Sequence, residues 1–180
     1  MSSDLNNEIE FLVEFVNTRD LEEETDAVAE PALLRSWIAE NTGELVSEPD
    51  GTELQRVLDL RESLRALLRG NNGHEPGAAD LTALRAAVER SRYRPTLSPQ
   101  GLVTLDPARA DLSGFEARLL LALERLQTQG AWPRLKACTD DGCQWAFYDS
   151  TRNHSRTWCS MDVCGNREKT RRYRRRKDSG

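Results

Sequence analysis

The chain has 180 residues, of which 38% are hydrophobic and 31% charged, and its formal net charge is −5. This length accommodates one ordinary domain, or one domain and a small module. The longest apolar runs, such as Leu119 to Leu123, are far shorter than the about 20 residues needed to cross a bilayer, so no membrane-spanning helix is expected.

The first ten residues contain acids and asparagines, whereas a signal peptide begins with basic residues followed by an apolar run. We therefore expect a cytoplasmic protein. In that compartment disulfides are disfavoured and clustered cysteines more often bind a metal.

Three helices are expected in the first part of the chain. Apolar residues recur at helical intervals from Glu8 to Arg19, although β-branched and aromatic side chains leave a strand as an alternative there. Pro31 is suited to open a second helix, which Gly43 ends. A third helix runs from about Thr52 to Arg69 and stops at the Gly-Asn-Asn-Gly breaker of residues 70–73.

Two more helices and a hairpin follow. Asp80 is placed to cap a helix from Leu81 to Ser91, with Leu81, Leu84 and Val88 on its buried side. Two extended runs between Tyr93 and Asp106 flank a turn and predict a small β-hairpin. Asp111 begins a helix through Gln127 that buries Phe115, Leu119, Leu120, Leu123 and Leu126. Residues 1–130 are therefore predicted to form a mostly helical domain.

All four cysteines, Cys138, Cys143, Cys159 and Cys164, lie in the last 43 residues, with the spacing C-x4-C, fifteen residues, C-x4-C. Four thiolates close a tetrahedral zinc site and leave no position for a catalytic water. We expect one structural Zn²⁺ ion, and His154 is an alternative ligand that the four thiolates make unnecessary. The closed site, and the lack of any acid–base or nucleophile constellation, argue against an enzyme.

The region around the cysteines has the layout of a treble-clef-like zinc finger at residues 131–180. The first pair lies on a tight turn, residues 144–149 alternate as a short strand, and a helix is expected to begin after Cys164. The fold class is therefore mainly α, with a helical N-terminal domain and a C-terminal finger that ends in a basic helix.

Charge is distributed unevenly along the chain. Residues 1–130 contain 24 acidic and 13 basic residues, whereas residues 165–180 contain eight basic and two acidic ones. Such asymmetry indicates an anionic partner for the basic end. The candidate nucleic-acid-binding residues are Arg152, Arg156, Asn166, Arg167, Lys169, Arg171, Arg172, Arg174, Arg175 and Arg176.

On a helix, Arg167, Arg171, Arg174 and Arg175 fall close to one side, with Lys169, Arg172 and Arg176 widening it. Arginine makes bidentate contacts with phosphates and guanine edges. The alternative is a solvated tail whose charge only aids solubility.

Two stretches resemble known families. Residues 138–169, with Trp145-Ala-Phe-Tyr-Asp-Ser-Thr-Arg-Asn and the intact Cys164-Gly-Asn-Arg167 tetrapeptide, resemble the CGNR zinc finger. Phe15-Val-Asn17-Thr18 and Leu60-Arg61-x-x-Leu64 resemble the ABATE domain that usually precedes it. The resemblance implies a bacterial transcription regulator, described as stress-induced, whose finger binds DNA.

By the same resemblance, the ABATE-like domain is expected to sense a ligand or partner. Because one short finger gives limited sequence specificity, a homodimer joined through the N-terminal domain is also expected. Asn17, Thr18 and Arg61 are polar residues within apolar runs and are candidates to line a small-molecule pocket. The alternative is that they cap helices or pair with carboxylates in the core.

The function expected from all of this is zinc-dependent binding of double-stranded DNA by a transcription regulator. A protein-interaction adaptor and an RNA-binding module are the alternatives.

Overall fold

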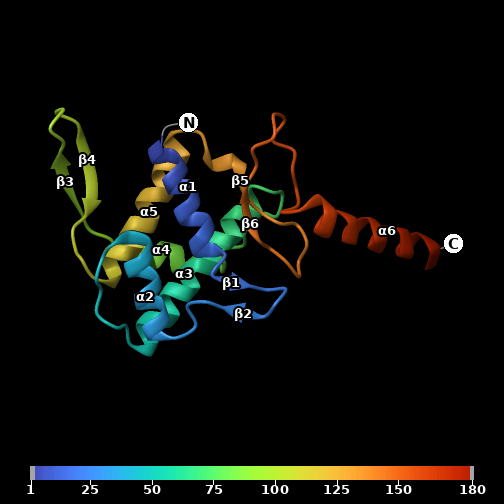
Figure 1. Ribbon diagram of the computed structural model, residues 1–180, viewed down its shortest axis with the longest axis horizontal. Coiled ribbons are helices and arrows are strands. Elements are labelled where there is room, and N and C mark those ends of the chain that lie inside the picture. Colours follow the sequence, from blue (N-terminus) through green and yellow to red (C-terminus); the bar gives the residue numbers. More distant parts are fainter. Residues whose placement is uncertain (1–2, 179–180) are drawn as a thin grey trace.

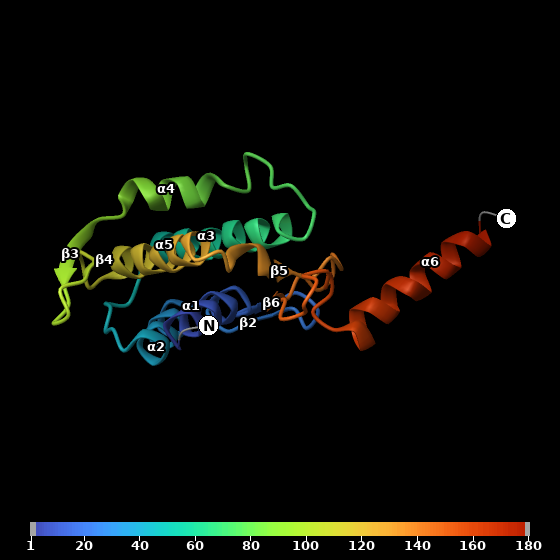
Figure 2. The ribbon, with the colours of Figure 1, turned by 90° about the horizontal axis from the view of Figure 1, so that it is seen from above.

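The computed structural model describes residues 3–178 and has a helical body from which two elements project (Figures 1 and 2). The five helices of the body are α1 (Ser3–Val16), α2 (Pro31–Thr42), α3 (Gly51–Gly70), α4 (Thr82–Arg90) and α5 (Leu112–Thr128). The hairpin of β3 (Tyr93–Leu97) and β4 (Val103–Pro107) lies at one end of the molecule and α6 (Asn166–Asp178) at the other. The mainly α fold class is confirmed.

The helix boundaries follow local sequence signals. Asp50 and Glu53 form a reciprocal capping box at the start of α3. Asp111 accepts a hydrogen bond from the Gly114 amide at the start of α5, and Gly43 ends α2 in the left-handed conformation. Of the two alternatives for residues 8–19, the helix is correct as far as Val16, where α1 ends, and α1 begins five residues earlier than predicted.

The body packs around one core to which α1, α2, α3 and α5 contribute. Phe11, Phe15, Trp37 and Phe115 form an aromatic cluster with ring centroids 5.4–6.3 Å apart. All five apolar residues predicted on the inner side of α5 are buried. In the described part of the chain, no helix is long and apolar enough to cross a membrane.

Two predictions about α4 are wrong. Asp80 does not cap this helix, because its carboxylate accepts a hydrogen bond from the Gly77 amide instead and the helix begins at Thr82. Val88 is 59% exposed, and the only residue of α4 that is buried is Ala87. The helix lies as an outer layer against α3 and α5, so only a narrow side of it is covered.

The sequence did not predict the short hairpin of β1 (Arg19–Asp20) and β2 (Thr25–Asp26), whose two-residue strands carry no periodicity. The β3–β4 hairpin is antiparallel as expected. The strand expected at residues 144–149 is present as β6 (Ala146–Tyr148), and it pairs with β5 (Leu135–Ala137), a strand that the sequence did not predict. Leu135, Ala137 and Ala146 belong to the core of the helical body. The first half of the finger is therefore packed into the helical body.

Candidate metal centre and nucleic-acid interface

The first two cysteines are held by a turn that continues from β5. The Cys138 amide donates to the carbonyl of Trp145, and the Cys143 amide donates to the carbonyl of Asp140. Gln144 closes the turn in the left-handed conformation with φ of 49°. These bonds point both thiols of this turn, the knuckle of residues 138–143, to the same side.

The second pair lies at a single wide helical turn, Met161–Gly165, which Cys159 precedes by two residues. Ser160 caps this turn by accepting a hydrogen bond from the Val163 amide, at 3.3 Å. Cys164 lies within the turn, and α6 begins directly after it. The turn therefore fixes both the last thiol and the start of the basic helix.

The four thiols form a compact cluster. Their sulfur atoms all lie within 4.8 Å of one another, with Sγ–Sγ distances of 3.5 Å for Cys143–Cys159 and 3.7 Å for Cys159–Cys164. Zinc–sulfur bonds of about 2.3 Å in a tetrahedron place sulfurs about 3.8 Å apart, so the donor set fits Zn²⁺. Three of the four residues are buried. The finger binds one structural zinc ion through these cysteines.

The electrostatics of the cluster also favour a cation. Burial raises the pKa of the Cys164 thiol to about 12 and also raises the pKa of Cys159, whereas the hydrogen bond with Cys143 lowers the pKa of Cys138 to about 5. A divalent metal compensates the charge of thiolates that could not otherwise ionise together. The side chain of His154 is exposed and does not belong to the cluster.

A buried ion pair supports the loop between the two cysteine pairs, and sequence reasoning missed it. Lys136 Nζ donates to Asp149 Oδ2 at 2.9 Å and to the carbonyls of His154 and Arg156 at 2.7 and 3.0 Å. Asp149 also accepts bonds from Thr151 and from the Arg156 amide. Burial alone would raise the pKa of Asp149, but these donors outweigh it and hold the pKa well below its usual value.

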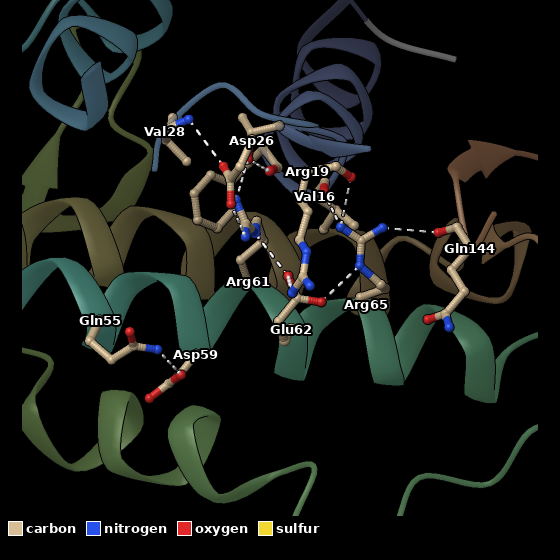
Figure 3. Close-up of polar contacts among 12 residues, drawn as sticks. Val16, Arg19, Asp26, Val28, Gln55, Asp59, Arg61, Glu62, Arg65 and Gln144 are labelled. Carbon is tan, nitrogen blue, oxygen red and sulfur yellow. Dashed lines mark hydrogen bonds and ion pairs between the residues drawn. The ribbon is translucent and has the colours of Figure 1, made fainter. Parts of the chain in front are cut away.

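The C-terminal end of α3 holds the finger through side chains that bond to its backbone. Asn71 donates to the carbonyls of Trp132 and Leu135, and Asn72 donates to those of Ala137 and Thr157, all at 2.8 Å. Arg65, whose side chain is 3% exposed, donates to the carbonyls of Gln144 and Val16, as Figure 3 shows. Residues 70–73, predicted as a helix breaker, thus also hold the finger against the helical body.

The three candidate pocket residues bond within the protein. Asn17 makes two hydrogen bonds with the backbone of Ala146 in β6, at 2.7 and 3.0 Å. Arg61 is 1% exposed and makes a bidentate pair with Asp26, visible in Figure 3, and a bond to Thr18 Oγ1. These contacts favour the stated alternative of core pairing. A cavity of about 590 Å³ lies elsewhere, between α3 and α4.

The candidate nucleic-acid residues divide into two groups. Arg156 is tied to the finger through bonds to the carbonyls of Trp158 and Cys159 and through the Phe147 ring, 4.7 Å from its guanidinium. Arg167 pairs with Glu22 and Asp140, and Arg171 pairs with Asp140. The Arg171 side chain is nevertheless 48% exposed, and the other exposed side chains are those of Arg152, Asn166, Lys169, Arg172, Arg174, Arg175 and Arg176.

Among the exposed group, two side chains bond within α6 or its first turn. Arg175 pairs with Glu168 at 2.8 Å, and the Asn166 amide group donates to the Asp162 carbonyl. Within the described residues, no hydrogen bond or ion pair engages the side chains of Arg152, Lys169, Arg172, Arg174 or Arg176. The predicted basic helix is thus present, but the side centred on Arg167 and Arg171 is partly occupied.

Comparison with known families agrees with this geometry. Residues 134–177 match the model of the CGNR zinc finger, and residues 10–137 match that of the ABATE family, described as "Putative stress-induced transcription regulator". The two matches meet at β5, where the finger enters the helical core. None of the curated proteins compared with the chain matches it. The chain belongs to the ABATE family and carries a C-terminal CGNR zinc finger.

Proposed function

We propose that this protein is a transcription regulator whose finger binds double-stranded DNA through α6. The observation that carries the proposal is the position of α6, which projects from the body (Figures 1 and 2). The basic side chains of α6 other than Arg167 are exposed. A single helix fits the major groove of B-DNA, and arginines along it can reach phosphates and guanine edges.

The charges of α6 support an anionic partner. Arg171 and Arg175, and Arg172 and Arg176, lie four residues apart, where like charges destabilise a helix. A helix of 13 residues that contacts little else is marginal in water. Phosphates would neutralise this repulsion, so DNA is expected to increase the helix content of residues 166–178.

The test is selection from a randomised double-stranded DNA pool across a salt series, with zinc-loaded protein and Cys159→Ser as the control. Enrichment of one sequence that the variant loses would support a sequence-specific regulator. A steep salt dependence without enrichment would reduce the role of α6 to general anion binding.

The two alternatives give different outcomes in the same experiment. Preference for single-stranded or structured RNA over the DNA pool would favour an RNA-binding module. No binding to either nucleic acid, together with a function that survives removal of α6, would favour an adaptor. The proposal includes no catalytic step and places the regulator in the bacterial cytoplasm.

We also propose that the protein is a homodimer, joined through the β3–β4 hairpin. The register puts Tyr93, Pro95, Leu97, Val103, Leu105 and Pro107 on one face, and all but Pro107 are exposed. Contiguous exposed apolar faces mark interaction sites. Light scattering should give a dimer for the wild type and a monomer for Val103→Asp, whereas Thr104→Asp on the opposite face should stay dimeric.

A small-molecule effector, if one acts here, is proposed to bind between α3 and α4. The cavity of about 590 Å³ has the size of a ligand site and is lined by the small side chains of Ala79, Ala83 and Ala86 as well as by polar groups. Ala83→Trp would fill it. An effector that alters DNA affinity in the wild type should have no effect on this variant.

A further inference from the structure

The knuckle contains a buried acid that, within the described residues 3–178, forms ion pairs with the basic helix alone. The side chain of Asp140 is 1% exposed, and Oδ1 accepts bonds from Arg171 Nη1 at 3.0 Å and from the Gly142 amide at 3.2 Å. Its Oδ2 lies 3.3 Å from Arg167 Nη1 but accepts no hydrogen bond. A buried carboxylate is costly unless it is paired, so both arginines are held at this point.

The next acid in the sequence, Asp141, differs from Asp140 in both exposure and pairing. Asp141 is 83% exposed and pairs with Arg69 of α3, away from the basic helix. Glu22, the other partner of Arg167, is 40% exposed, and exposed pairs contribute little. Asp140 is thus the buried connection between the zinc knuckle and α6.

We propose that Asp140 is a positioning residue that fixes the direction of α6, so that Arg167 and Arg171 act as anchors. The opposite side of the helix then faces the nucleic acid. Lys169, Arg172 and Arg176 lie three and four residues apart, share that side and are exposed. The expectation that they widen the side of Arg167 and Arg171 is therefore wrong. This inference rests on the proposed function for its DNA contacts, while the anchoring itself does not.

The sign of the effect separates positioning from simple electrostatics. Asp140→Asn removes one negative charge next to the basic helix, so electrostatics alone predicts equal or tighter DNA binding. Loss of positioning predicts weaker binding. We expect a loss of about tenfold in affinity with zinc still bound at one ion per chain. The matched control Asp141→Asn removes the same charge and should bind as well as the wild type.

A measurement without DNA tests the anchoring independently. Amide hydrogen exchange at residues 166–172 should be faster in Asp140→Asn than in the wild type and unchanged in Asp141→Asn. If the wild type binds no DNA but this difference is present, the proposed function fails and the anchoring stands. Exchange equal to that of the wild type, or DNA binding that is equal or tighter, would overturn the proposal.

A second variant guards against misfolding of the knuckle. Arg171→Lys keeps the charge and leaves every knuckle residue in place, but it loses the planar fork that reaches Asp140. It should retain zinc and still show faster exchange at residues 166–172.

The triple variant Lys169→Gln, Arg172→Gln and Arg176→Gln tests the side of α6 assigned to DNA. It should lower the salt slope of DNA binding by roughly 2 to 3, because each lost phosphate contact removes about 0.9. An unchanged slope would contradict the assigned face.

Discussion

The two halves of the zinc finger are held in different ways. The half that includes β5, the knuckle and β6 shares the core of the helical body and is bonded by Asn17, Arg65, Asn71 and Asn72. The other half, residues 157–178, has fewer such supports and ends in a helix that projects from the body. The difference indicates that zinc stabilises the two halves to different extents. The first half is already held by the helical body, whereas zinc is the main stabilising contact of residues 157–178.

Removal of zinc is the strongest way to test this comparison. A chelator, or Cys159→Ser, should abolish the order of residues 157–178, because structural zinc contributes on the order of 10 kcal/mol or more to small metal-dependent folds. Residues 135–148 should stay protected because the helical body holds them. Hydrogen exchange of both segments with and without metal measures this.

Equal loss of protection in both segments would mean that the finger folds as one metal-dependent unit. Retained protection in residues 157–178 would mean that zinc is dispensable there. Mutation of the Lys136–Asp149 pair is an independent test, because this pair supports the loop between the two cysteine pairs without contacting the metal.

Lys136→Met should cost about 3–5 kcal/mol of unfolding free energy, since it leaves the buried Asp149 carboxylate without its cation. The pH dependence has a defined sign. The pKa of Asp149 is lowered by folding, so its contribution is present above the unfolded value of about 3.9 and is lost as the pH falls below it. The deficit of the variant should therefore shrink on acidification. Denaturant melts at pH 7 and pH 3.5 check both parts.

Sequence patterns predicted those features that depend on neighbours along the chain. The C-x4-C pairs identified the metal ligands, and Asp111 and Gly43 marked helix ends correctly because capping is local. Hydrophobic spacing found the buried side of α5. It failed at Val88, where the tertiary position of α4 and not its periodicity decides what is covered.

Contacts between distant segments could not be predicted. Lys136 and Asp149 look like ordinary surface charges until the β5–β6 register brings them together. Asn71 and Asn72 read as a helix breaker, and nothing nearby indicates that they bond to backbone more than 60 residues away. The side of α6 that is anchored likewise depends on Asp140, which lies 27 residues before Arg167. Helix caps can be predicted from neighbouring residues, whereas the partners of long-range contacts can be identified only from the three-dimensional structure.

Asn72→Ala should have an intermediate effect. The variant removes the side-chain donor to the Ala137 carbonyl and leaves the Thr157 carbonyl with the Thr139 amide alone, which costs about 1–3 kcal/mol for buried groups. Because Thr157 belongs to the zinc-dependent half, we expect faster exchange at residues 157–164 with no loss of zinc. Asn41→Ala, which removes a side-chain amide bond within the exposed end of α2, is the control and should leave exchange in the finger unchanged.

The smallest effect on stability is expected at the free end of α6. A chain that ends after Arg171 keeps both partners of Asp140 and removes the exposed side chains of residues 172–177, whose loss usually changes unfolding free energy by about 0.5 kcal/mol or less. Its melting temperature and zinc content should match those of the wild type, whereas its DNA affinity should fall steeply. A chain that ends after Gly165 loses both arginines and leaves Asp140 buried without a cation, so it should be the less stable of the two. If the two truncations were equally stable, the boundary between the supported finger and its free end would have to lie before Arg167.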